Sequence, residues 1–180
     1  MIKKIILAGG CFWCIEGSYR RISGVTKAIS GYCGGTSTSP SYEAVSTGKT
    51  GHAESVYLEY NSDQAVLEEI LDVFWLIHNP TTFDRQGADI GTQYRSAIFY
   101  FDDEDLPIIT RSINAQQRNY KEEIVTEVVK TEIEKFYLAD AGHQDFYNKN
   151  MDAVYCKAII KPKIEKIEKI FGKRKSNILY

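Results

Sequence analysis

The chain has 180 residues, which suits a single compact domain over residues 1–180 with a core that needs no disulfide staples. Its 22 basic and 24 acidic residues give a net charge of -2, which argues against a strongly basic nucleic-acid-binding or membrane-surface protein. Apolar residues make up 43% of the chain, but no apolar run approaches the length of a membrane span. We therefore expect an ordinary globular protein with no nucleic acid and no membrane among its partners.

The first residues predict a strand that leads into a helix. MIKKIILAGG has a brief apolar stretch and no cleavage region, so we expect a strand at 2–7 rather than a signal peptide. Without an export signal, a reducing cytoplasmic compartment is expected, where disulfide frameworks are rare. The four cysteines are Cys11, Cys14, Cys33 and Cys156. We therefore expect each of them to be either a reactive thiol or a buried core residue, and not part of a structural disulfide.

Alternation and helical spacing of apolar residues predict the other elements. In chain order these are a helix at 12–22 ending at Gly24, strands at 25–32 and 53–60, a helix from a cap at Asp63 to Ile77, a strand at 96–101 and a helix at 102–120. The last third predicts short strands at 124–129 and 136–139, a short helix within 142–150, a strand at 155–161 and a helix at 163–171.

Short strands interleaved with helices indicate an α+β domain. We expect a two-layer sandwich in which a mixed, mainly antiparallel sheet packs against helices. Two long irregular stretches, 33–52 and 79–95, are expected to form active-site loops, because loops of that length in compact domains are usually functional. The basic segment KRK at 173–175 is expected to be a solvated helix end.

Residues 9–16, GGCFWCIE, place a cysteine where a thiol can react. Cys11 would lie at the start of the helix at 12–22, where unpaired N–H groups and the helix dipole favour a thiolate. Gly9 and Gly10 permit a tight turn and leave room for another molecule to approach the sulfur. Phe12 and Trp13 would then wall an apolar pocket, unless both are simply core residues.

Cys11 and Cys14 are three residues apart, so they are neighbours on one face of a helix. Their Cα atoms would be about 5 Å apart, which lies within the range of a disulfide. A reversible dithiol is therefore possible. A structural zinc site normally takes four ligands, and only a chance approach of Cys33, His52 or His143 would complete one here.

Glu54 continues an otherwise apolar side of the strand at 53–60, shared with Val56, Leu58 and Tyr60. If this carboxyl is buried, desolvation favours its neutral form and makes it a proton donor. The alternative is that Glu54 lies in water at a frayed end of the strand.

Several segments together resemble the peptide methionine sulfoxide reductases of the A type, which act on the S epimer of the sulfoxide. The matching segments are GCFW at 10–13, GY-x-GG at 31–35, PSYEAV-x-x-G-x-TGHAE at 40–54, D-x-GTQYRSAI at 89–98 and HQDFY at 143–147. They cover most of the chain in the order of the family, so the resemblance is more specific than any one motif.

The resemblance implies a role for each matching residue. Cys11 matches the nucleophile, and Phe12 and Trp13 match the aromatic wall that receives the methyl group of the substrate. Glu54 matches the acid that is hydrogen-bonded to the sulfoxide oxygen.

Residues in the two irregular stretches complete this implied site. Tyr42 and Tyr94 match the phenols that help to hold the sulfoxide oxygen, and Asp89 matches a polar residue near the same pocket. The resemblance therefore implies that the long loops at 33–52 and 79–95 carry residues of the active site.

The resemblance leaves open which thiol resolves the Cys11 sulfenic acid. Cys156 aligns with the resolving cysteine of many family members, and this precedent slightly favours it. However, YCKAIIK at 155–161 looks like a strand rather than a flexible segment. Cys14 stands where the family often has glycine, and it is close to Cys11 by geometry. Cys33 is either a small core residue or a third cysteine that takes part in the thiol chemistry.

The implied activity is the thiol-dependent reduction of methionine S-sulfoxide, free or in peptides and proteins, and hence repair of oxidised proteins under oxidative stress. A Cys11 sulfenic acid and then a disulfide would form, and an external reductant, expected to be thioredoxin, would reopen the bridge. No metal and no tightly held cofactor is expected. Two other classes remain: a thioredoxin-like dithiol oxidoreductase, which would leave Glu54, Tyr42 and Tyr94 without a task, and a zinc-binding or structural module.

Overall fold

The computed structural model describes residues 1–171, so the predicted helix end at 173–175 lies outside the described residues. The strands are β1 (Ile2–Gly9), β2 (Val25–Cys33), β3 (Ala53–Asn61), β4 (Arg85–Gln86), β5 (Asp89–Ile90), β6 (Ser96–Tyr100), β7 (Glu127–Lys130) and β8 (Tyr137–Leu138). The α-helices are α1 (Phe12–Tyr19), α2 (Tyr42–Ser46), α3 (Leu67–Ile77), α4 (Asp105–Gln117), α5 (Phe146–Lys149) and α6 (Lys161–Phe171). Short 3-10 turns occupy Thr92–Tyr94, Ile133–Lys135 and Ala141–His143, and a π-helical turn occupies Cys156–Ile160.

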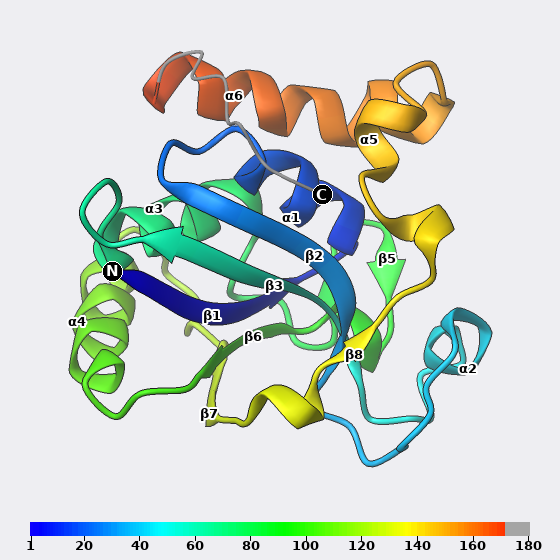
Figure 1. Cartoon of the computed structure of the whole chain (residues 1–180), viewed down its shortest axis with the longest axis horizontal. Coiled ribbons are helices and arrows are strands. Elements are labelled where there is room, and N and C mark those ends of the chain that lie inside the picture. Colours follow the sequence, from blue (N-terminus) through cyan, green and yellow to red (C-terminus); the bar gives the residue numbers. More distant parts are fainter. Residues whose placement is uncertain (172–180) are drawn as a thin grey trace.

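Six strands form one mixed sheet in the order β7-β6-β1-β3-β2-β8 (Figure 1). All neighbours pair antiparallel except β6 and β7, which are parallel. Strands β4 and β5 form a separate hairpin. The predicted α+β fold with a mixed, mainly antiparallel sheet is confirmed.

The alternation of the central strands divides their side chains between two faces of the sheet. Ile5, Leu7 and Val56 pack on the face covered by α1 and α3. Ile6 and Phe99 point to the other face, where Phe136 from the segment between β7 and β8 covers them. Helix α6 packs against α1 and α3 along one edge of the view, and α4 packs against α3 (Figure 1).

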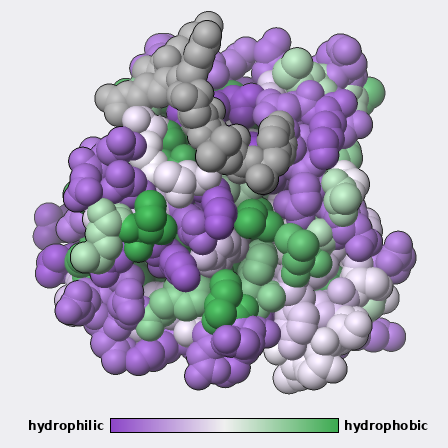
Figure 2. All heavy atoms as spheres, in the orientation of Figure 1, coloured by the Kyte–Doolittle hydropathy of each residue, from purple (hydrophilic) through white to green (hydrophobic). Residues whose placement is uncertain are grey.

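The surface in this orientation is mainly hydrophilic at its rim (Figure 2). Hydrophobic side chains come to the surface mostly near the middle of the face, over the region of the strands (Figure 2). Within residues 1–171, no helix combines the length and apolarity that crossing a membrane requires.

The predicted cap at Asp63 is wrong, because α3 begins at Leu67 and Val66 is its N-cap. Residues 61–65 instead form a turn in which the Ala65 N–H donates to the Asn61 carbonyl. The Asp63 carboxylate points to solvent and pairs with the N-terminal amine at 2.9 Å. The helices predicted at 12–22 and 102–120 are also shorter than expected, and Gly24 lies in a turn rather than directly after the helix.

The predicted strand at 155–161 is also wrong. Residues 156–160 form a π-helical turn that continues into α6. Cys156, Ile160, Ile164 and Ile167 are all buried, and their spacing of three or four residues places them on one helical face. Burial against α1 therefore decided in favour of a helix over the short-range strand propensity of CKAII.

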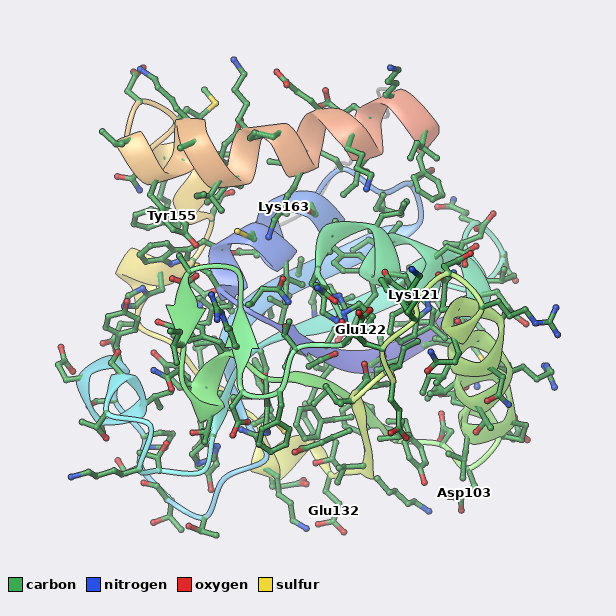
Figure 3. The ribbon with its side chains drawn as sticks, turned by 180° about the vertical axis from the view of Figure 1, so that it is seen from behind. Asp103, Lys121, Glu122, Glu132, Tyr155 and Lys163 are labelled. Atoms are coloured by element: carbon green, nitrogen blue, oxygen red, sulfur yellow. The ribbon has the colours of Figure 1, made fainter. Side chains whose placement is uncertain are left out.

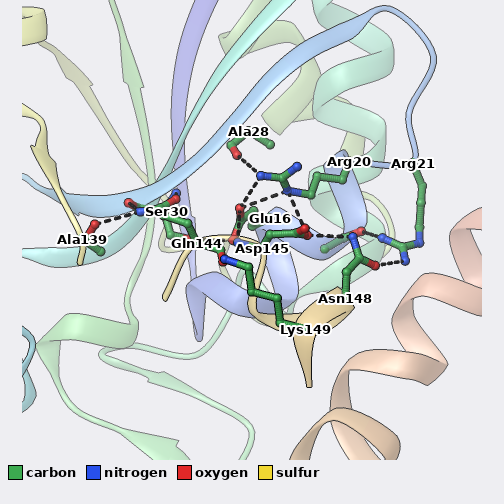
Figure 4. Close-up of polar contacts among 11 residues, drawn as sticks. Glu16, Arg20, Arg21, Ala28, Ser30, Ala139, Gln144, Asp145, Asn148 and Lys149 are labelled. Atoms are coloured by element: carbon green, nitrogen blue, oxygen red, sulfur yellow. Dashed lines mark hydrogen bonds and ion pairs between the residues drawn. The ribbon is translucent and has the colours of Figure 1, made fainter. Parts of the chain in front are cut away.

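A buried polar network ties the segment that contains α5 to α1 (Figure 4). The Glu16 carboxylate accepts hydrogen bonds from the Ser30 hydroxyl at 2.9 Å and from the Asp145 N–H at 2.8 Å, and it pairs with Arg20 at 3.0 Å. Glu16 is 1% exposed, and burial raises the pKa of its carboxyl against the effect of these partners. Gln144 adds hydrogen bonds to both backbone groups of Ser30.

Replacing Glu16 by alanine is expected to lower the free energy of unfolding by about 3–5 kcal/mol, because buried partners lose their acceptor. Urea denaturation followed by circular dichroism measures this change. Glu165→Ala is the matched control, since its exposed pair with Lys161 is expected to contribute less than about 1 kcal/mol. Equal unfolding midpoints for the two variants would contradict a stabilising role for the network.

Candidate active site

Cys11 lies at the turn from the central strand β1 into α1. Gly10 has a φ of +93°, a conformation that glycine adopts readily, and Cys11 is the N-cap residue of the helix. The tight turn was predicted, but the expected room at the glycines is filled by the chain itself. A Cβ at Gly9 would lie 2.9 Å from the His78 ring, and a Cβ at Gly10 would lie 2.6 Å from Gln86.

Glu54 reaches the same place from β3, beside Tyr32 of β2. Its side chain is 2% exposed, so of the two readings of Glu54 the structure supports the buried carboxyl over the solvated strand end. The Phe12 N–H, at the start of α1, donates a hydrogen bond of 3.0 Å to Glu54 Oε2. Burial raises the pKa of Glu54 to about 8, helped by the negative charge of Asp89 and opposed by the Phe12 hydrogen bond. The carboxyl is therefore mainly protonated at neutral pH.

The prediction that the helix start favours a Cys11 thiolate is wrong for the protein without substrate. Burial raises the pKa of Cys11 well above its usual value, and the neighbouring Cys14 and Glu54 raise it further. The Cys11 side chain makes no hydrogen bond to the helix N-terminus. One physical reason is that Glu54, rather than the sulfur, accepts the Phe12 N–H.

Cys14 is the more acidic of the two thiols. A side-chain hydrogen bond with Cys11 lowers the pKa of Cys14 to about 7, although burial opposes this shift. Lys163 and the Tyr155 hydroxyl also lower it. The two thiols interact with each other in one buried cluster, so the spacing of Cys11 and Cys14 brings them together as neighbours, as the sequence predicted.

Tyr42, Tyr94 and Asp89 approach this pair from the two irregular stretches. Tyr42 begins the short helix α2, and Tyr94 ends a 3-10 turn. Burial raises the pKa of both phenols, and the charges of Glu54, Cys11 and Asp89 add to it for each. Both phenols therefore lie within electrostatic reach of the Cys11 thiol and the Glu54 carboxyl, and Asp89 and Cys11 line one cavity.

Phe12 and Trp13 form an aromatic wall whose other members the sequence did not identify. The Trp13 ring stacks on Phe146 with centroids 3.7 Å apart, and His143 stacks on Trp13 at 5.8 Å. His143 also lies 4.4 Å from the Tyr42 ring. The HQDFY segment at 143–147 was part of the family resemblance. Only the contacts in the folded structure show that its His143 and Phe146 rings extend the aromatic wall.

Tyr155 is a further residue that the sequence did not identify. Its hydroxyl donates a hydrogen bond of 3.2 Å to Asp89 Oδ2, and it also interacts with the thiols of Cys11 and Cys14. Burial raises its pKa, and the nearby Cys11 adds to this effect. The only signal in the sequence was its position directly before Cys156.

The remaining cysteines differ in their positions. Cys156 is fully buried in the cluster that contains Cys11 and Cys14, and burial raises its pKa, as does the charge of Cys14. Cys33 lies in the core cluster on the opposite face of the sheet, 4.0 Å from the Thr131 hydroxyl. Of the two readings for Cys33, the structure supports the small core residue.

His52 also has a structural role, since its ring forms hydrogen bonds with the backbone of Gly35 and Ser37 in the loop after β2.

Within residues 1–171, no three His, Cys, Asp or Glu side chains converge in a way that could hold a metal ion. The groups that do converge are two interacting thiols, a buried carboxyl with a raised pKa, phenols and an aromatic wall. This set can polarise and protonate a bound oxygen atom next to a sulfur nucleophile.

Known proteins share both the sequence and the fold. Residues 3–175 match the family model described as peptide methionine sulfoxide reductase. The peptide methionine sulfoxide reductase MsrA of Psychrobacter cryohalolentis is 47% identical over 171 residues, covering 95% of this chain and 97% of the relative.

Solved structures support the same relationship. Mxr1 of Saccharomyces cerevisiae in its reduced form is 36% identical with a TM-score of 0.79, covering 86% of this chain and 89% of that one. Mxr1 in complex with Trx2 matches with a TM-score of 0.57 at 27% identity, covering 81% and 84%. The chain belongs to the peptide methionine sulfoxide reductase family and is an oxidoreductase enzyme.

Proposed function

We propose that this enzyme reduces methionine S-sulfoxide, free or in peptides and proteins, with Cys11 as the nucleophile and Glu54 as the acid. The observation that carries the proposal is the neutral, buried Glu54 carboxyl beside the Cys11 thiol, held by the Phe12 N–H at 3.0 Å. The choice of the S epimer of the sulfoxide as substrate follows from the resemblance to the A-type reductases. Repair of oxidised proteins in the cytoplasm is the physiological role that follows from this activity.

In the first step, Glu54 protonates the sulfoxide oxygen, and the sulfur becomes electrophilic. The hydroxyls of Tyr42 and Tyr94 donate hydrogen bonds to the developing charge. The positive sulfur lowers the pKa of the adjacent Cys11, so the thiolate forms when substrate is bound. Cys11 attacks the substrate sulfur and forms an S–S bond with it. The oxygen then passes from the substrate sulfur to the Cys11 sulfur as this S–S bond breaks, so that methionine leaves and Cys11 is left as a sulfenic acid. Overall, one thiol and one sulfoxide give one sulfenic acid and one sulfide, so atoms and electrons balance.

The aromatic wall supports the binding of the methyl group in this scheme. Trp13 and the Phe146 ring stacked on it lie next to Cys11, and the fully buried Phe12 ring contacts Trp13 with centroids 6.2 Å apart. Trp13 Nε1 and His143 Nδ1 are buried and lack a hydrogen-bond partner among the described residues. Polar groups of a peptide substrate would satisfy them.

In the second step, Cys14 resolves the sulfenic acid. Its thiolate attacks the Cys11 sulfur, an S–S bond forms, and the oxygen leaves as water after taking up a proton. The side-chain hydrogen bond between the two thiols and the Cys14 pKa of about 7 support Cys14 over Cys156, which family precedent favours. A thioredoxin then reopens the bridge, as the complex of the similar Mxr1 with Trx2 suggests. No bound cofactor is needed in this scheme.

Peptide mapping after one equivalent of sulfoxide tests the choice of resolving thiol. We expect a Cys11–Cys14 disulfide in the wild type and in Cys156→Ser. Cys14→Ser is expected to slow loss of the sulfenic acid at pH 7 by at least about tenfold while still releasing one methionine per chain. A Cys11–Cys156 peptide in the wild type, with normal turnover by Cys14→Ser, would instead assign resolution to Cys156.

A further inference from the structure

Two rings of the aromatic wall come from one short segment of the chain after β8. His143 ends a 3-10 turn, and Phe146 begins the four-residue helix α5. Both rings stack on Trp13, with centroids 5.8 Å away for His143 and 3.7 Å away for Phe146. Turns and helices of this length are not stable in water on their own. The positions of the two rings therefore depend on bonds between this segment and the rest of the protein.

Gln144, the first of the two residues between these rings, binds the segment to β2 (Figure 4). Its side-chain oxygen accepts a hydrogen bond of 3.0 Å from the Ser30 N–H, and its Nε2 donates one of 2.8 Å to the Ser30 carbonyl. Nε2 also donates to the Ala139 carbonyl at 2.9 Å. Gln144 thus fixes the chain to the sheet directly after His143.

Asp145, the second residue between the rings, binds the segment to α1, the helix that carries Trp13. Its N–H donates to the Glu16 carboxylate at 2.8 Å, and its own carboxylate pairs with Arg20 at 3.4 Å. That carboxylate also accepts a hydrogen bond of 2.7 Å from Asn148 of α5. The φ of +53° at Asp145 lies in the left-handed region, which glycine, asparagine and aspartate adopt more readily than other residues. These bonds therefore hold a backbone conformation that most side chains would disfavour.

Glu16 connects the two anchors, because its carboxylate accepts hydrogen bonds from both the Ser30 hydroxyl and the Asp145 N–H. Glu16 follows Trp13 by three residues, so the two side chains are neighbours on α1. The carboxylate that receives the segment and the ring that the segment covers therefore belong to adjacent turns of one helix.

Tyr155 also contacts Trp13, but it is held by contacts of its own. Its ring meets Trp13 edge-on with centroids 6.1 Å apart. Figure 3 shows Tyr155 where the chain enters the helical turn before α6. Its hydroxyl is bonded to Asp89, and the next residue, Cys156, is fully buried. The network around Gln144 therefore serves the His143 and Phe146 rings in particular.

We propose that Gln144 and Asp145 are positioning residues for substrate binding, because their bonds to β2 and α1 hold the His143 and Phe146 rings against Trp13. The inference rests on the proposed function, in which this wall receives the methyl group of the substrate. Neither positioning residue touches the substrate in this scheme. Loss of either anchor is therefore expected to weaken substrate binding and to leave the chemical step unchanged.

The experiment replaces each anchor by alanine and follows single-turnover release of methionine from N-acetylmethionine S-sulfoxide methylamide. The dependence of the rate on substrate concentration gives a dissociation constant and a limiting rate. Gln144→Ala and Asp145→Ala are each expected to raise the dissociation constant about five- to tenfold and to change the limiting rate by less than about twofold. The buried Tyr147 still packs with Ile160 and Ile164 in these variants, so α5 stays attached. The two variants break different bonds, so either one suffices if the other does not fold.

Two further variants separate positioning from general stability. Asp145→Asn is expected to keep the wild-type dissociation constant, because asparagine adopts the left-handed conformation and its side-chain oxygen can accept from Asn148. Gln117→Ala is the matched control, since Gln117 also forms three hydrogen bonds to backbone groups, but at the end of α4. It is expected to leave both constants unchanged. Equal behaviour of Gln117→Ala and Gln144→Ala would contradict a positioning role.

Fluorine NMR of the substrate-free enzyme tests the placement of the rings without any turnover. The chain has two tryptophans, Trp13 and Trp75, so labelling with 5-fluorotryptophan gives two resonances, which Trp75→Phe assigns. The Trp13 resonance is expected to move in Gln144→Ala and Asp145→Ala towards its position in Phe146→Ala, which lacks the stacked ring. The Trp75 resonance is expected to stay in place.

An unchanged Trp13 resonance in both alanine variants would overturn the proposal, and so would unchanged dissociation constants. A fall in the limiting rate alone would also overturn it, because the effect would then lie on the chemical step. Failure of the proposed function is distinguishable from these results, since the wild type itself would release no methionine from the sulfoxide. The role in substrate binding would then fail as well, while the fluorine shifts would still decide whether the anchors place the rings.

Discussion

Cys11→Ser is expected to lower the turnover of methionine S-sulfoxide by more than about 10³-fold with dithiothreitol as the reductant. A serine hydroxyl can neither supply the two electrons of the reaction nor accept the oxygen as a sulfenic acid. Methionine release measured by chromatography gives the rate. The single-turnover burst is expected to disappear as well, because the first chemical step is lost rather than the recycling of the enzyme.

Cys33→Ser is the matched control for this variant. Cys33 is fully buried on the other face of the sheet, away from the three clustered cysteines, so its replacement leaves the chemistry intact. We expect a modest loss of stability and an unchanged rate at 25 °C. Activity of Cys11→Ser close to that of the wild type would refute the assignment of the nucleophile.

Glu54→Gln is expected to reduce the rate of the first step by about 10²–10⁴-fold, the usual contribution of a positioned general acid. The amide can still donate a hydrogen bond to the sulfoxide oxygen, but it cannot transfer a proton. Some activity therefore remains, in contrast to Cys11→Ser. Glu59→Gln is the control on the same strand, since Glu59 pairs with Lys27 at the surface.

The pH dependence provides a second test of Glu54. Its pKa is raised to about 8, so the carboxyl is protonated below that pH and charged above it. The single-turnover rate of methionine release is therefore expected to fall as the pH rises through about 8. Glu54→Gln is expected to lack this decline. Retention of the same decline in the variant would exclude Glu54 as its source.

The resolving step is expected to have the opposite pH dependence. The attacking group is the Cys14 thiolate, whose pKa in the reduced enzyme is lowered to about 7 chiefly by the hydrogen bond with Cys11, and its fraction increases from pH 6 to pH 8. Disulfide formation is expected to become faster over this range while the first step does not. Quenched-flow samples that are mapped for both methionine and free thiols separate the two rates.

The sequence by itself was sufficient to propose the candidate site residues and to predict most central elements. The blocks around Cys11, Glu54 and Tyr94 are local in the chain, and so is the alternation that predicts β1, β2, β3 and β6. Such patterns are readable because they depend on neighbours within a few residues. The cap of α3 and the helix at 156–160 were mispredicted because tertiary packing overruled local preference there.

Only the tertiary structure decided which of the two thiols, Cys11 or Cys14, has the lower pKa, and which residues surround them. Position 11 at a helix start predicted a thiolate, but burial and the neighbouring Cys14 and Glu54 raise the pKa of Cys11 instead. Tyr155 and Lys163 reach the site from segments about 140 residues further along the chain, and no local pattern announces them. A pKa depends on desolvation and on charges gathered from distant segments, so it is fixed by the fold and not by the motif.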